Sequence, residues 1–144
     1  MNDDEYSIRM ILDAQEMAWN TGDSVSWGAP YSHDADFVNI LGQFLQGRRA
    51  MVDRHAQIFS GPFEGSRVAI TIRRFRKLGE ALASIDTIHE VSGFQSLPPG
   101  IVATSTGKLR TLMKYLALKE AGSWQFVAAQ NTAILPEQGS AARS

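Results

Sequence analysis

The spacing of apolar residues changes once along the chain and divides it into a helical part and a strand-rich part. In the first part, apolar side chains recur every three or four residues, which is the period of an amphipathic helix. This spacing predicts helices over residues 4–21, 24–31 and 47–59, the second of them weakened by a glycine and a proline. Residues 35–40 and 44–46 predict a strand, a turn and a short returning strand between the second and third helices.

In the second part, apolar and polar residues alternate, which is the pattern of half-buried strands. Four long strands are expected, over residues 68–78, 81–91, 109–119 and 124–134. On the first of them, strict alternation places Val68, Ile70 and Ile72 on one face and Phe75 on the other. Short connections make these strands antiparallel, and helices gathered on one face of such a sheet give an α+β fold.

The composition excludes several classes of protein. A length of 144 residues is typical of one domain, which we expect to cover residues 1–135 and to leave a small, polar, flexible tail at 136–144. The formal net charge is −1, so the chain has no overall field to hold nucleic acid. The absence of cysteine excludes disulfides and thiolate chemistry. An acidic start and the lack of a membrane-length apolar stretch predict a cytoplasmic protein with no membrane partner.

Four short motifs, in order along residues 4–134, resemble those of SnoaL-like and nuclear-transport-factor-2-like proteins. They are Ala-Trp-Asn-Thr-Gly-Asp at 18–23, His-Asp-Ala-Asp-Phe-Val-Asn at 33–39, Gln-Gly-Arg at 46–48 and Trp-Gln-Phe-Val-Ala-Ala-Gln-Asn-Thr at 124–132. The resemblance implies a cone-shaped, cystatin-like fold, in which a strongly bent antiparallel sheet wraps around the N-terminal helices. It also implies a cavity between the first helix and the concave face of the sheet, and a homodimer formed through the outer face of the sheet.

The same superfamily includes ketosteroid isomerases, limonene epoxide hydrolases, polyketide cyclases and non-catalytic binding modules, so the resemblance does not decide the function. The isomerases carry an aspartate base and a tyrosine at the positions that match Asn39 and Gln15 here. A neutral amide cannot accept a proton from carbon at pH 7, so we reject the isomerase mechanism for this chain. Asn39 is then a ligand-binding residue or a turn residue that bonds its own backbone. Gln15, a polar residue on an apolar stripe, is expected to bind a ligand or an internal group.

Two histidines are the remaining acid–base candidates. His55 lies on the apolar face of the third predicted helix, and His89 shares the inward side of a strand with Ile85 and Thr87. Either imidazole could act as a general acid or base in a pocket, and either could instead be a packed core residue.

Four further residues complete the candidate binding set. Trp19 lies on the apolar stripe of the first helix, as a core residue or a ligand platform. Arg110 could clamp a carboxylate or form a surface ion pair. Gln130 and Asn131 are neighbours on a strand, so one of them should face the cavity.

We expect no metal and no cofactor. His33, Asp34 and Asp36 cluster in a predicted helix-to-strand loop, where such residues turn the chain. The basic run at 73–77 is split by alternation between two faces, which favours a solvated surface over a nucleic-acid-binding stripe.

Three functions remain open. The first is binding of a small hydrophobic or carbonyl-bearing molecule without catalysis, in a cavity where amides replace carboxylates. The second is an isomerase or polyketide-cyclase-like enzyme that uses His55 or His89. The third is a dimeric adaptor in which the cavity is incidental.

Overall fold

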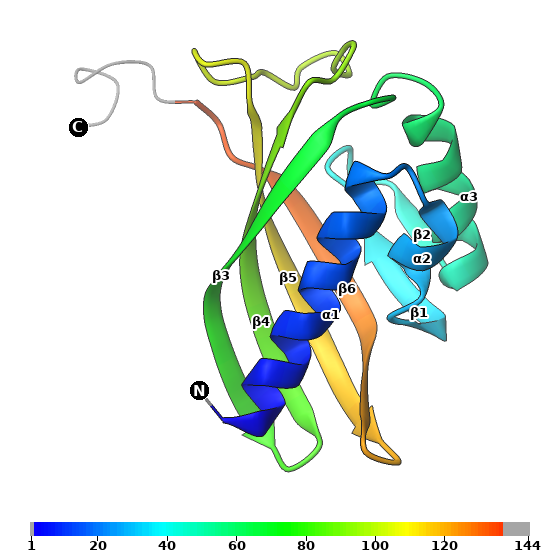
Figure 1. Ribbon diagram of the computed structural model, residues 1–144, viewed down its shortest axis with the longest axis vertical. Coiled ribbons are helices and arrows are strands. Elements are labelled where there is room, and N and C mark those ends of the chain that lie inside the picture. Colours follow the sequence, from blue (N-terminus) through cyan, green and yellow to red (C-terminus); the bar gives the residue numbers. More distant parts are fainter. Residues whose placement is uncertain (1, 137–144) are drawn as a thin grey trace.

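A computed structural model describes residues 2–136 of the chain and shows three helices and six strands (Figure 1). The helices are α1 (Asp3–Asn20), α2 (Ser24–Gly28) and α3 (Arg48–Phe59). The strands are β1 (Tyr31–Val38), β2 (Phe44–Gln46), β3 (Arg67–Gly79), β4 (Leu82–Ser92), β5 (Leu109–Glu120) and β6 (Ser123–Ala133). The expected tail lies, from residue 137 onward, outside the described residues. Within residues 2–136, no helix is long and apolar enough to cross a membrane.

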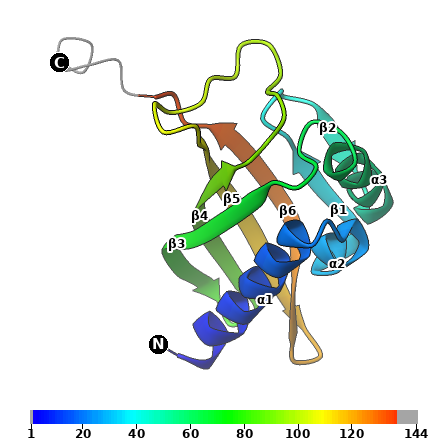
Figure 2. The same ribbon diagram turned by 45° about the horizontal axis from the view of Figure 1, so that its top comes forward.

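The strands form one curled sheet in the order β2-β1-β6-β5-β4-β3. The four long strands are antiparallel neighbours, as predicted, although a long loop over residues 93–108 connects β4 to β5. β1 and β6 pair in parallel, so the sheet is mixed. The expectation of a wholly antiparallel sheet is wrong at this pair. These two strands come from opposite ends of the chain, and no hairpin sets their relative direction. α1 lies across the concave face of the sheet (Figures 1 and 2), and the α+β prediction is confirmed.

The segment that leads from α2 into β1 differs from the prediction. α2 ends at Gly28 and does not reach residue 31, because Pro30 lacks the N–H that would continue the helix. β1 begins at Tyr31, four residues before the predicted start, and its first residue pairs with β6. Local pattern does not reveal so distant a partner. The candidate cluster at 33–36 therefore lies on a strand and not in a loop.

A β-bulge changes which residues of β3 face the core. The register between β3 and β4 shifts after Ile72, which leaves Arg73 as the extra residue. Phe75 then packs against the core on the same side as Ile72. Its predicted place on the opposite face is wrong, because one extra residue reverses the alternation beyond it.

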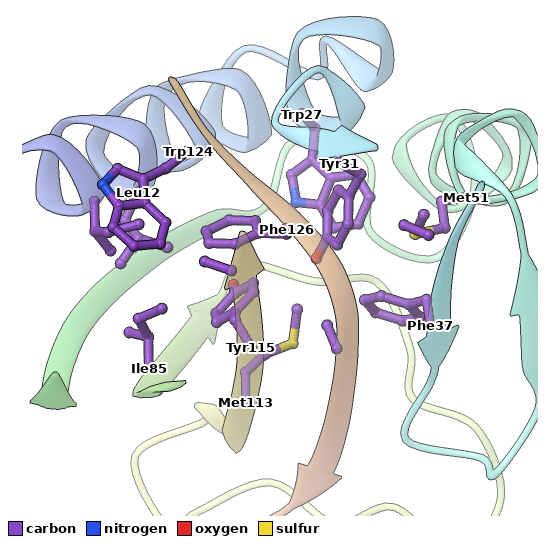
Figure 3. Close-up of a cluster of buried hydrophobic side chains, with 14 of the residues drawn as sticks. Leu12, Trp27, Tyr31, Phe37, Met51, Ile85, Met113, Tyr115, Trp124 and Phe126 are labelled. Carbon is purple, nitrogen blue, oxygen red and sulfur yellow. The ribbon is translucent and has the colours of Figure 1, made fainter. Parts of the chain in front are cut away.

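The main core lies between the concave face of the sheet and the helices (Figure 3). Its centre is aromatic: the rings of Tyr115 and Phe126 have centroids 4.2 Å apart, and Tyr31 packs edge-on against Phe126 at 5.5 Å. Leu12 of α1 and Met51 of α3 reach into the same cluster. Burying each such side chain fully contributes about 1.5–3 kcal/mol, so this cluster holds the helices on the sheet.

Asp4 anchors the N-terminal end of α1 to the sheet. Its carboxylate accepts hydrogen bonds from Lys77 Nζ at 2.8 Å, Lys119 Nζ at 2.9 Å and Trp124 Nε1 at 3.1 Å. The Lys77 ammonium, followed by the other two donors, holds the pKa of Asp4 well below its usual range. One acidic residue in the first turn thus connects α1 to β3, β5 and β6.

Candidate functional site

A cavity of about 140 Å³ lies at the end of the sheet where the C-terminal part of α1 meets α3. The β1–β2 turn and the β4–β5 loop contribute to its walls, and these elements meet at the upper end of the molecule in Figure 1. The largely apolar walls include Trp19, Phe37, Ile58, Phe63, Val91 and Leu109. An apolar cavity of about 150 Å³ holds one benzene molecule, so there is room for a single ring or a short branched chain.

His55 is held in the cavity wall by contacts on two sides. Its Nδ1 lies 2.9 Å from the Met51 carbonyl, and because a carbonyl only accepts, Nδ1 carries the proton. The Trp27 ring stacks on the imidazole with centroids 3.5 Å apart. Burial, assisted by the nearby Arg54 cation, lowers the pKa of His55 to about 4. The ring is therefore neutral at pH 7, and its Nε2 has no hydrogen-bond partner among residues 2–136.

His89 lines the same cavity from the inward face of β4. Its Nε2 lies 3.2 Å from the Tyr115 hydroxyl on β5, and the two groups share a hydrogen bond. Burial lowers the pKa of His89 to about 4 and raises the pKa of Tyr115. Both groups are uncharged at pH 7, and Nδ1 of His89 bonds to none of the described residues. The cavity thus holds two neutral imidazoles from different elements.

A second β-bulge decides whether Gln130 or Asn131 faces the cavity. The register between β5 and β6 shifts between Leu116 and Ala117. Strict alternation from the inward-facing Phe126 would put Gln130 inside, but the shift puts Asn131 there and Gln130 on the outer face. Oδ1 of Asn131 is buried and has no hydrogen-bond partner within the described part of the chain. This unpartnered oxygen therefore belongs to a residue of the cavity wall.

The β1–β2 turn brings Asn39 and Arg54 together at the cavity. Oδ1 of Asn39 accepts hydrogen bonds from the backbone N–H groups of Leu41 and Gln43, at 3.0 and 2.9 Å. Its Nδ2 donates to Gln43 Oε1 at 3.0 Å, and the Arg54 guanidinium donates to the same oxygen at 2.6 Å. The Asn39 amide is engaged by the turn, whereas Arg54 is held beside the cavity by a neutral partner.

Trp19 belongs to both the core and the cavity wall. Its Nε1 donates to Ser66 Oγ at 2.9 Å, so its one polar atom is satisfied within the protein. Its ring packs edge-on against Phe59 and Phe63, with centroids 4.9 and 5.8 Å apart. It can therefore offer a ligand its apolar surface and no hydrogen bond.

The other predicted site residues lie away from the cavity. Gln15 is buried between α1 and α2, where its Nε2 donates to the Trp27 carbonyl at 2.9 Å. Arg110 lies on the outer face of the sheet and pairs with Glu90 at 3.1 Å. Gln130 also points outward. The predicted residues that do meet at the cavity are Trp19, Asn39, His55, His89 and Asn131.

Two residues of the site were missed by sequence reasoning. Arg54 occupies the stripe that also carries Met51, His55 and Ile58, so helical spacing contained the signal. However, the charge of Arg54 predicts a solvated side chain and not one in a cavity wall. Tyr115 reaches His89 only across paired strands, and no local pattern indicates that contact.

No family model matches the chain, and no curated protein matches it. Solved structures do match. A domain of unknown function with a cystatin-like fold from Nostoc punctiforme has a TM-score of 0.80 and 26% identity, over 94% of this chain and 80% of that one.

Two other similar structures are more distant in sequence. An NTF-2-like protein of unknown function from Shewanella oneidensis has a TM-score of 0.73 and 15% identity, over 89% of this chain and 98% of that one. A ketosteroid isomerase-like protein from Erwinia carotovora atroseptica has a TM-score of 0.72 and 18% identity, over 94% of this chain and 100% of that one. The chain therefore has the cystatin-like fold that its motifs predicted.

Proposed function

We propose that this protein binds a small, largely apolar organic molecule in the cavity between α1, α3 and the concave face of the sheet. The observation that carries the proposal is the contrast between apolar walls and a few polar groups. Apolar surface removed from water supplies affinity, and the polar groups of His55, His89 and Asn131 set the orientation. A buried acceptor without a partner costs about 1–3 kcal/mol, and a ligand hydroxyl or amide that donates to Asn131 removes that cost.

The size of the cavity restricts the ligand. At about 140 Å³ it is smaller than the 300–1,000 Å³ or so of a drug-sized site. A single ring that carries a carbonyl, amide or hydroxyl group fits this space.

Calorimetric titration with benzamide tests the proposal. We expect the unchanged protein to bind benzamide, and Ile58→Trp, which fills the cavity from α3, to weaken binding by about tenfold or more. Val25→Trp is the matched control because Val25 is exposed on α2 and does not line the cavity. Equal affinities in the two variants would contradict a ligand site in this cavity.

A second candidate function is proton transfer at a carbon next to a carbonyl group. The geometry of His55 favours it, because the bond from Nδ1 to Met51 leaves the lone pair on Nε2 for a substrate proton. The similarity to a ketosteroid isomerase-like protein supports the same class of reaction. His55 would take the role of the base that Asn39 cannot perform. His89 would donate to the carbonyl oxygen through Nδ1.

Deuterium exchange separates this candidate from simple binding. In D2O, a base that removes a methyl proton from acetophenone and returns a deuteron produces a loss of the methyl signal in the proton NMR spectrum. We expect the exchange rate to rise as the pH increases through about 4, where His55 loses its proton, and to be abolished in His55→Gln. A rate no higher than that of buffer alone would leave binding without catalysis.

We also propose that two copies associate through the outer face of the sheet. The support is a group of apolar residues on that face whose side chains are only half-buried, namely Ile88, Leu112, Leu116 and Leu118. Sedimentation equilibrium should give twice the mass of the chain, and Leu116→Glu should give a monomer. A monomeric unchanged protein would contradict the proposal and the adaptor role with it.

A further inference from the structure

The cavity contains one permanent charge that nothing in the described part of the chain neutralises. Arg54 is the only ionised side chain among the described residues that line it, and no aspartate or glutamate joins it there. The ion pairs within residues 2–136 involve other cations and leave out Arg54. Its neighbour Arg49, five residues earlier on α3, is paired with Asp53 at 3.7 Å.

The guanidinium is positioned although it is not neutralised. It donates to Gln43 Oε1 at 2.6 Å, and Asn39 Nδ2 donates to the same oxygen at 3.0 Å. Asn39 is in turn bonded to the backbone of the β1–β2 turn. This chain of contacts orients one edge of the guanidinium and leaves its other N–H groups for a further acceptor, since guanidinium has five.

The charge acts on the cavity itself. Arg54 is one of the groups that disfavour a second positive charge on His55. A site that disfavours a cation beside apolar walls favours an anion in the same place, and partial exclusion of water strengthens the attraction. Guanidinium matches the geometry of a carboxylate, with two parallel hydrogen bonds.

We propose that the ligand is a small monocarboxylic acid, with its ring or branched hydrocarbon body in the cavity and its carboxylate on Arg54. This inference rests on the proposed binding function and adds the charge of the ligand to it. The body replaces water against the apolar walls, and the carboxylate supplies the partner that the guanidinium lacks.

Three probes of the same shape and different charge test the proposal: benzoate, benzamide and benzamidine. Calorimetric titration at pH 7 should show that the unchanged protein binds benzoate about tenfold or more tightly than benzamide, and benzamidine most weakly. Raising the salt concentration should reduce the preference for benzoate, because the charges are partly exposed to solvent.

Two arginine variants assign the preference to one residue. Arg54→Met should remove the preference for benzoate while benzamide still binds. Arg49→Met should keep it, because Arg49 lies on the same helix and does not line the cavity. The thermal unfolding of both variants checks their folding, and the three probes test the charge preference on the unchanged protein whether or not a variant folds.

The outcomes separate the two proposals. Equal binding of benzoate and benzamide, tighter binding of benzamidine, or a preference that survives in Arg54→Met overturns the carboxylate assignment and leaves the binding cavity in place. Failure of all three probes to bind overturns the cavity function and the carboxylate assignment together.

Discussion

At the scale of single residues, burial sets the chemistry of the cavity histidines. Both rings are largely removed from water, which disfavours the imidazolium form and lowers the pKa of each to about 4. A base with so low a pKa is present in the correct protonation state at pH 7 but accepts a proton weakly. This is why we rank binding before catalysis.

The same shifts predict how stability depends on pH. Each histidine has a lower pKa when folded than the ordinary value of 6.5, so the unfolded chain binds the proton more tightly. The contribution of each neutral, buried histidine to the stability of the fold is therefore complete above about pH 6.5 and is lost as the pH falls toward 4. We expect a loss on the order of 3 kcal/mol per histidine in the free energy of unfolding, measured by urea titration between pH 7 and pH 4.

Variants assign this loss to the buried rings. His89→Asn should flatten the dependence of the unfolding free energy on pH in this window. His33→Gln should leave it unchanged, because His33 is exposed on β1. If the two variants follow the same curve as the unchanged protein, burial does not control these groups.

At the scale of elements, two β-bulges select which side chains face inward. Each inserts one residue into a strand and reverses the alternation beyond it, in β3 for Phe75 and in β6 for Asn131. The bulge in β6 has the greater effect on function, since it places an amide with a buried, unpartnered oxygen in the cavity wall.

A pair of adjacent substitutions tests the bulge in β6. Asn131→Leu removes a buried acceptor without a partner and should stabilise the ligand-free protein by about 1 kcal/mol, measured by urea unfolding. Gln130→Leu, on the outer face, should change stability by no more than about 0.5 kcal/mol. Asn131→Leu should also weaken the binding of benzamide, and the opposite ranking of the two variants would place Gln130 inside.

At the scale of the whole molecule, contacts between distant parts of the chain hold the helices over the sheet. Asp4, near the start, binds Lys119 and Trp124 near the end, as well as Lys77 in β3. The cavity lies at the opposite end of α1, so this anchor fixes the helix whose other end carries Trp19.

Removing the anchor should destabilise the protein in a pH-dependent way. The hydrogen bond from Lys77 and those from Lys119 and Trp124 hold the pKa of Asp4 below its usual range. Its contribution is therefore present above that range and is lost as the pH falls through the lowered pKa. Asp4→Asn should lower the midpoint of thermal unfolding at pH 7 more than Asp3→Asn does, because Asp3 is exposed in the same turn. The difference between Asp4→Asn and the unchanged protein should shrink as the pH is lowered toward 2.

Local sequence determined most of the elements and the fold. The helices at 4–21 and 47–59 and the four long strands were predicted to within one or two residues, because hydrophobic period and turn residues are local properties. The motifs around Trp19, Asn39 and Trp124 predicted the cystatin-like fold that the solved structures share. Alternation on β4 also predicted that His89 points inward.

Tertiary structure alone decided the early start of β1, its parallel pairing with β6, and the choice of Asn131 over Gln130. Each depends on a partner strand far away in sequence, and a shift of one residue in pairing reverses every side chain beyond it. Likewise, the lowered pKa values of His55 and His89 arise from burial by residues of several elements. Arg54 lines the cavity without an ion-pair partner among residues 2–136, which is also a result of the tertiary arrangement. These properties depend on how residues far apart in the sequence are arranged in space, and local sequence patterns do not determine that arrangement.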